Sequence, residues 1–68
     1  MCLLIVKQEG CKINPEHLTE AFSSNSDGAG FFVAGVSMKK GFWSAKEVVE
    51  YYKEHEKRAM IIHFRFST

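Results

Sequence analysis

Short apolar runs alternate along the chain with segments whose apolar residues repeat at helical spacing. Residues 3–6 are apolar with β-branched side chains, and Lys7 and Gly10 close the run, which predicts a buried strand. Cys2 then lies at the tip of this strand. Residues 31–36 form another apolar run and predict a second strand.

Two helices are predicted between the strands. Asn14 followed by Pro15 is typical of a helix N-cap and first turn, and Leu18 and Phe22 fall four residues apart on one face. We therefore expect a short helix over residues 15–22.

The second helix is indicated by a capping box and a longer repeat. Ser44 and Glu47 fit the capping-box spacing. Apolar and aromatic positions then follow at helical spacing, in a charged stretch that ends near Arg58: Val48, Val49, Tyr52 and His55.

Turn signals separate these elements. Residues 23–30 are mostly small, polar or glycine, and Asp27-Gly28 is a turn pair, so the chain is expected to reverse there. Residues 38–41 resemble a hairpin connection from the strand at 31–36 to a short segment at 42–43, which predicts an antiparallel pair.

The last predicted strand covers residues 60–66. Its alternation places Met60, Ile62, Phe64 and Phe66 on one face and Ile61, His63 and Arg65 on the other. The element order β-α-β-β-α-β predicts an α+β fold in a single small domain, residues 1–68. This order fits a ferredoxin-like unit or the start of a larger α+β sandwich, and does not choose between them.

Composition narrows the function classes. Of the 68 residues, 46% are apolar, and the formal charge of +1 lacks the basic surplus of a nucleic-acid-binding protein. The apolar opening is too short for a signal peptide or a membrane span, so a cytoplasmic protein is expected. The three histidines and two cysteines have no metal-ligand spacing; we expect free thiols, no metal and no cofactor.

Cys2 is the first candidate for chemistry. Removal of a methionine before a small residue would make Cys2 the first residue, with thiol and α-amine together. An α-amine has a pKa of about 8 and can accept the proton of its own thiol. The alternative is a small apolar residue at a strand start.

Two further features come later in the chain. Arg65 offers a planar fork for a carboxylate, next to His63 and in the same row as Thr68. The alternative is a surface arginine and a histidine bonded to backbone. The small residues at 26–30, among them Asp27, Gly28 and Gly30, suit a close backbone approach or an ordinary turn.

Together these features resemble a known family. Met-Cys at the start, NSDGAG before an apolar strand and HFRFST after another occur in this order in class II glutamine amidotransferases, which are N-terminal nucleophile hydrolases. The family motif is His-x-Arg-x-Ala/Ser-Thr, usually continued by His-Gly, whereas here it ends at Thr68. The segments NPEHLTEAF and SAKEVVEYYKEH lie where small standalone members also carry helices.

The resemblance assigns roles residue by residue. It implies that Cys2 attacks the side-chain amide of glutamine, forms a thioester and releases ammonia, once Met1 has left. Arg65 would hold the α-carboxylate of glutamine, and Thr68 would lie beside it. Asp27, Gly28, Gly30 and His63 would support the site. Glutamine is the implied substrate, and a synthetase or acceptor domain the implied partner.

The resemblance also implies catalytic and substrate-binding groups that residues 1–68 do not contain. The oxyanion-hole Asn-Gly and the Asp for the amino group of glutamine lie beyond the matched motif, and loss of oxyanion donors costs about 10²- to 10³-fold in rate. We expect residues 1–68, as the N-terminal part of an αββα sandwich, to be inactive alone.

Two other interpretations stay open. One is an inactive mini-protein of the same origin, acting as a binding or inhibitory module or a homo-oligomer through aromatic residues: Phe31, Phe32, Trp43 and Tyr52. The other is an unrelated ferredoxin-like domain.

Overall fold

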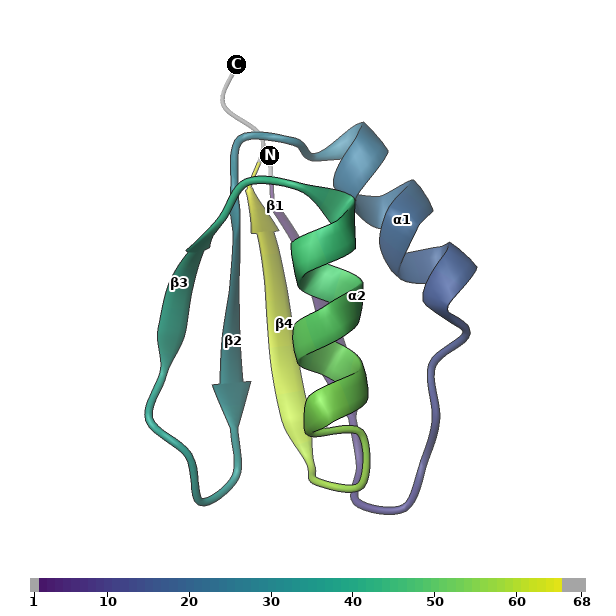
Figure 1. The fold of residues 1–68 in the computed structure, drawn as a ribbon, viewed down its shortest axis with the longest axis vertical. Coiled ribbons are helices and arrows are strands. Elements are labelled where there is room, and N and C mark those ends of the chain that lie inside the picture. The colour runs from purple at the N-terminus through teal and green to yellow at the C-terminus, as the bar shows by residue number, and fades with distance from the viewer. Residues whose placement is uncertain (1, 66–68) are drawn as a thin grey trace.

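The computed structural model describes residues 2–65 and contains a sheet with two helices (Figure 1). The elements follow in this order: β1 Cys2–Lys7, α1 Pro15–Ser24, β2 Ala29–Val33, β3 Lys39–Phe42, α2 Ala45–Glu54 and β4 Met60–Arg65. The predicted order of strands and helices, and with it the α+β class, is confirmed.

The sheet has the strand order β1-β4-β2-β3, and all its neighbouring strands are antiparallel. β4 and β2 are the inner strands, while β1 and β3 form the edges. A ferredoxin-like sheet has its first strand inside. The edge position of β1 therefore separates this sheet from the ferredoxin-like alternative, although the element order is the same.

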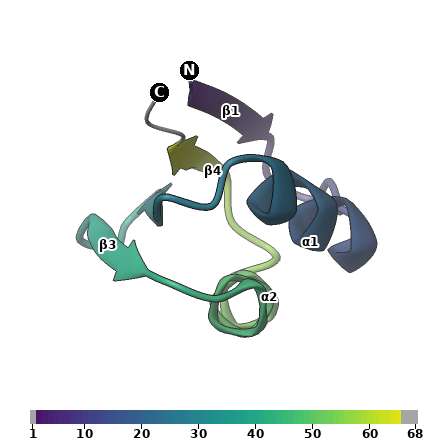
Figure 2. The same cartoon turned by 90° about the horizontal axis from the view of Figure 1, so that it is seen from above.

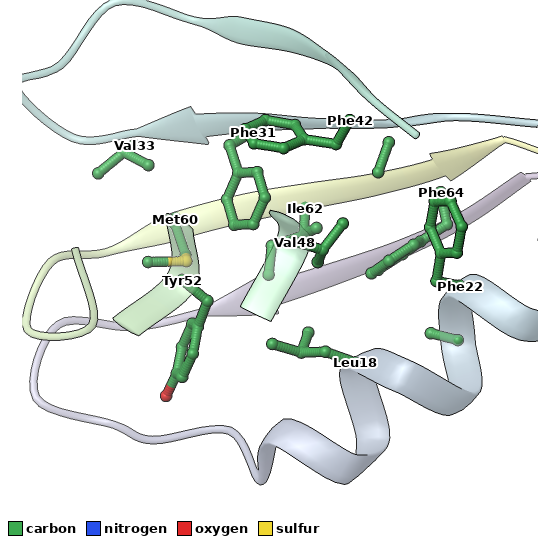
Figure 3. Close-up of a cluster of buried hydrophobic side chains, with 12 residues drawn as sticks. Leu18, Phe22, Phe31, Val33, Phe42, Val48, Tyr52, Met60, Ile62 and Phe64 are labelled. Carbon is green, nitrogen blue, oxygen red and sulfur yellow. The ribbon is translucent and has the colours of Figure 1, made fainter. Parts of the chain in front are cut away.

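Both helices lie on one side of the sheet, so the protein has two layers (Figure 2). The core between the layers draws side chains from both helices and from β2, β3 and β4 (Figure 3). Its members are Leu18, Ala21, Phe22, Ala29, Phe31, Val33, Phe42, Val48, Tyr52, Met60, Ile62 and Phe64. The opposite side of the sheet has no helix against it among the described residues.

Strand β4 follows the predicted alternation. Met60, Ile62 and Phe64 are buried against the helices, whereas Ile61 and Arg65 are exposed and His63 is half-buried. Since successive side chains on a strand point to opposite faces, the last three belong to the open side. Residue 66 of the predicted strand lies outside the described residues.

Helix α1 begins where the cap signal predicts. The side chain of Asn14 accepts a hydrogen bond from the backbone N–H of Glu16 at 3.0 Å. Leu18 and Phe22 are both buried, as expected. The helix continues to Ser24, two residues beyond the prediction, because the backbone N–H of Asn25 still bonds to helix carbonyls.

Helix α2 also begins as predicted but ends earlier. The hydroxyl of Ser44 accepts from the N–H of Glu47 at 3.2 Å, and the Glu47 carboxylate accepts from the N–H of Trp43 at 3.2 Å. The predicted end near Arg58 is wrong: the helix ends at Glu54, with a cap at His55. From there the chain turns into β4.

The hairpin between β2 and β3 differs most from its prediction. The expected connection at 38–41 is largely strand β3, and the strand expected at 31–36 runs from Ala29 to Val33 instead. The chain reverses at Gly35, whose φ of +78° favours glycine. The N–H of Val36 closes this turn on the carbonyl of Val33 at 3.0 Å.

Replacing Tyr52 with Phe tests how the loop after β1 is held to the core. The buried Tyr52 hydroxyl accepts a hydrogen bond from the N–H of Ile13 at 2.7 Å. Its loss leaves that N–H without its partner, so we expect the free energy of unfolding to fall by about 1–2 kcal/mol in urea titrations. Tyr51→Phe is the control, since it keeps this bond. Equal stability of Tyr52→Phe and the wild type would contradict the role of this bond.

Candidate functional site

Cys2 and Arg65, two of the residues predicted to carry chemistry, lie on the open side of the sheet. Cys2 and Arg65 are direct partners in the antiparallel pairing of β1 with β4. Directly opposed residues share one face, with their Cβ atoms about 4.5–5.5 Å apart. Both side chains are exposed. The Cβ atoms of Cys2, at the start of the chain, and of Arg65, in the last described strand, are therefore neighbours on the open side of the sheet.

The turn at Asp27 and Gly28 is joined to Arg65. The N–H of Arg65 donates to the carbonyl of Gly28 at 2.9 Å, and the N–H of Asp27 donates to the carbonyl of Arg65 at 2.8 Å. These two bonds extend the pairing of β2 with β4 beyond Ala29. All three sequence features that suggested chemistry thus meet at one end of the sheet.

His63 lies one step along the same face, opposite Leu4 on one side and Gly30 on the other. At Gly30 the pairing of β2 with β3 is irregular, and an added Cβ would lie 3.3 Å from the backbone carbonyl oxygen of Lys39. A side chain there would press on β3, which is the close backbone approach expected from this glycine-rich segment.

A hollow of about 510 Å³ opens on this face, over β2, β3 and β4. Five of the predicted site residues line it: Asp27, Gly28, Gly30, His63 and Arg65. Cys2 is not in its lining, since β1 lies on the other side of β4. Arg65 therefore separates the thiol from the hollow. Thr68, also predicted for this site, lies outside the described residues.

Trp43 forms a wall of the hollow that the sequence did not connect with the other site residues. A Cβ added at Gly28 would lie 3.4 Å from Cζ3 of the indole, and one at Gly41 would lie 3.9 Å from its Nε1. Two glycines thus leave room for the ring, which is nonetheless 69% exposed. The place of Trp43 in the wall of the hollow is therefore visible from the two glycines beside its ring in the structure, and not from a sequence motif.

The aromatic residues proposed for an interface divide into two groups. Phe31 and Tyr52 are fully buried in the core, so they cannot contribute to an interface. Phe32 and Trp43 are exposed and line the hollow together with Met38. The aromatic surface is therefore smaller than predicted and coincides with the candidate site.

Both cysteines are free, as the sequence predicts, and both are exposed. Within residues 2–65, His, Cys, Asp and Glu side chains form no group of three that would hold a metal ion. Neither helix in this range has the length and apolarity to cross a bilayer.

The chain was compared with known proteins in three ways. No protein-family model matches it, and neither the curated proteins nor the solved structures include a significant match.

Gly28→Ala tests the contact between the turn and Trp43. Gly28 has a φ of +126°, so alanine is strained there by about 1–3 kcal/mol, and its methyl group would also push on the indole ring. We expect both a loss of stability and a shift in Trp43 fluorescence.

Gly10→Ala is the matched control for this substitution. Gly10 has a φ of +82°, but a Cβ there would have nothing within 4 Å. This variant should lose stability without altering Trp43 emission in the folded protein. If both variants shifted the emission equally, the turn would not position the ring.

Proposed function

We propose that these residues carry the nucleophile and the carboxylate anchor of a class II glutamine amidotransferase. Cys2 would attack the side-chain amide of glutamine and release ammonia through a thioester. The observation that supports this most is the cross-strand pairing of Cys2 with Arg65. Without that pairing the sequence motifs would have no common site.

The spacing of the two strands supports glutamine as a bridge between Cys2 and Arg65. Neighbouring strands lie about 4.8 Å apart, and the Cβ atoms of residues directly opposite each other are at a similar distance. Glutamine separates its amide carbon from its α-carboxylate by a short, flexible stem of comparable length. With the carboxylate in the fork of Arg65, the amide would reach toward Cys2 on the neighbouring strand.

The bonds made and broken in this reaction belong only to Cys2, glutamine and water. After removal of Met1, the α-amine of Cys2 takes the thiol proton and the sulfur attacks the amide carbon. The C–N bond breaks, and ammonia leaves with the proton returned by the amine. Water then cleaves the thioester, giving glutamate and the free thiol. A cytoplasmic location would keep this thiol reduced.

Other residues have supporting roles in this proposal. The backbone bonds between Arg65 and the Asp27-Gly28 turn hold the backbone of Arg65 at the sheet end. The half-buried His63 lies next to Arg65 on the same face. Oxyanion donors and the group that binds the amino group of glutamine are not assigned to the described residues. A synthetase or acceptor domain would receive the ammonia.

An inactive binding or inhibitory module of the same origin is the second candidate. The open face favours it, because Leu4, Val6 and Phe32 are each at least half exposed, and contiguous apolar surface often marks an interaction site. A stable homodimer in sedimentation experiments, lost on Val6→Glu, would support this second function.

Labelling by a glutamine analogue tests the first proposal. An analogue with a chloroketone in place of the amide should label Cys2 of the protein lacking Met1, as located by peptide mass spectrometry. Cys11 is equally free and exposed, and serves as the internal control. Labelling of Cys11 in place of Cys2 would contradict the proposal.

The arginine is tested by the rate of the same labelling. Arg65→Ala should slow labelling about tenfold to hundredfold, since a hydrogen bond to a charged group contributes about 1.5–3 kcal/mol. Arg65→Lys should recover only part of the rate, because it lacks the planar fork. Because Arg65 is exposed, its replacement should leave the urea unfolding midpoint nearly unchanged. An unchanged labelling rate in Arg65→Ala would rule out the carboxylate role.

A further inference from the structure

The two edges of the sheet differ in how they are protected against other strands. Strand β3 forms one edge; it has four residues, carries the exposed Lys39 and Lys40, and pairs irregularly with β2. Short length, exposed lysines and irregular pairing are ways in which natural proteins keep edge strands from joining other chains. Strand β1 forms the other edge, with six residues that pair with β4 without a shift in register.

The charge that β1 does carry is turned away from its edge. Residues 2–6 are uncharged and include neither proline nor glycine. Lys7 ends the strand, but its ammonium donates hydrogen bonds to the carbonyls of Gln8 and Cys11, and its side chain is 3% exposed. Because the following loop holds this ammonium, it does not oppose an approaching strand as an exposed lysine would.

Strand β1 is exposed on both faces of the sheet. On the open side, Leu4 is 60% and Val6 70% exposed. On the helix side, Leu3 is 39% exposed and Ile5 is half-buried. β1 is also the one described strand that adds no side chain to the buried core. The helix layer therefore leaves apolar surface on both faces of this strand.

A further β-strand fits this edge. β1 is the outermost strand of the sheet, and no described segment lies beyond it (Figure 2). The backbone N–H and C=O groups on the outer side of an edge strand can pair with an added strand. Side chains of that strand would point alternately to the two faces, so apolar residues in it would cover both faces of β1. The matching partner is thus an extended apolar segment.

The sequence of β1 itself meets this requirement. A two-fold axis perpendicular to the sheet would pair β1 antiparallel with β1 of a second copy and keep the open sides of both copies together. This symmetry centres the pairing on one residue, and centring it on Leu4 gives only apolar pairs. Leu4 then lies opposite itself, Leu3 opposite Ile5, and Cys2 opposite Val6. Centring it on residue 5 would instead bring a lysine against a leucine.

We propose that the outer edge of β1 binds the same edge of a second copy of this chain, which joins two four-stranded sheets into one. This contact differs from a dimer through the open face, which would leave Leu3 exposed on the helix side. On the open side, Val6 of the second copy would lie beside Cys2, across from Arg65. The inference goes beyond the proposed function and does not depend on it, since it needs no chemistry at Cys2.

Sedimentation equilibrium from low micromolar to millimolar concentration tests the inference. Pairing over residues 2–6 buries less than the about 1,200 Å² of a standard interface, so we expect a reversible dimer with a dissociation constant of about 1–100 µM. Hydrogen exchange should slow in β1 at the higher concentrations, because its outer N–H groups then gain partners.

Two lysine substitutions distinguish this interface from one on the open face. Leu3→Lys places a charge opposite Ile5 of the second copy and should raise the dissociation constant about tenfold or more. Phe32→Lys is the matched control, because Phe32 is also exposed but lies on β2; it should change the constant less than about twofold. Far-ultraviolet circular dichroism checks that each variant is folded.

Disulfide cross-linking checks the register. In a background with Cys2→Ser and Cys11→Ser, Leu4→Cys sets one thiol opposite its own copy, with Cβ atoms about 4.5–5.5 Å apart, and mild oxidation should link the two chains. Phe32→Cys in the same background is the control and should cross-link much more slowly. Equal rates would contradict the pairing about Leu4.

Other results would also overturn the inference. One is a monomer at millimolar concentration; slow hydrogen exchange throughout β1 in that monomer would assign the edge to another segment of the same chain. Another is a dimer weakened equally by Leu3→Lys and Phe32→Lys, because the interface would then lie on the open face. Labelling of Cys2 decides the proposed function separately, whichever of these results is found.

Discussion

The sheet and its candidate site both depend on the pairing of β4 with β1 on one side and with β2 on the other. These ladders join the last described strand to the start of the chain and to the turn at Asp27. The register also sets the faces: a slip of one residue would turn Arg65 into the core and Phe64 out of it. Since Phe64 is fully buried, core packing strongly disfavours such a slip. The hydrophobic core therefore holds Arg65 directly opposite Cys2 on the neighbouring strand.

Much of the secondary structure could be predicted from local sequence patterns. The helix starts at Asn14 and Ser44 and the alternation along β4 depend on neighbouring residues, so the sequence shows them directly. The turn between β2 and β3 is predicted at residues 38–41, which include Gly41, but the chain reverses at Gly35. Both glycines have a positive φ in the structure, and the sequence does not show which of them makes the turn. Strand order depends on contacts between distant segments, and no local pattern encodes it.

The candidate site could also be predicted only in part from the sequence. Motif order drew attention to Cys2, Arg65 and the Asp27-Gly28 turn, while the hollow and its tryptophan wall exist only in three dimensions. Lys7 is a related case: it ends β1, as the sequence predicts, but its side chain is buried at 3% exposure, which the sequence does not indicate. Its ammonium donates to the carbonyls of Gln8 and Cys11, at 3.2 and 2.9 Å, and so fastens the following loop. Backbone partners of this kind leave no mark in sequence periodicity.

The open face of the sheet is apolar at one end and cationic at the other, and this restricts the kind of layer that could cover it. Toward the far end of β1 and β4, Val6 pairs with Ile61 and Ile61 pairs with Phe32, which forms an apolar row across three strands. At the other end Cys2 pairs with Arg65, and Lys40 lines the neighbouring hollow. An apolar layer over the whole face would remove both cations from water without a partner, which costs several kcal/mol for each ion. Any layer over this sheet must therefore leave the Arg65 end open or bring an anion to it, and a carboxylate-bearing substrate meets the second condition.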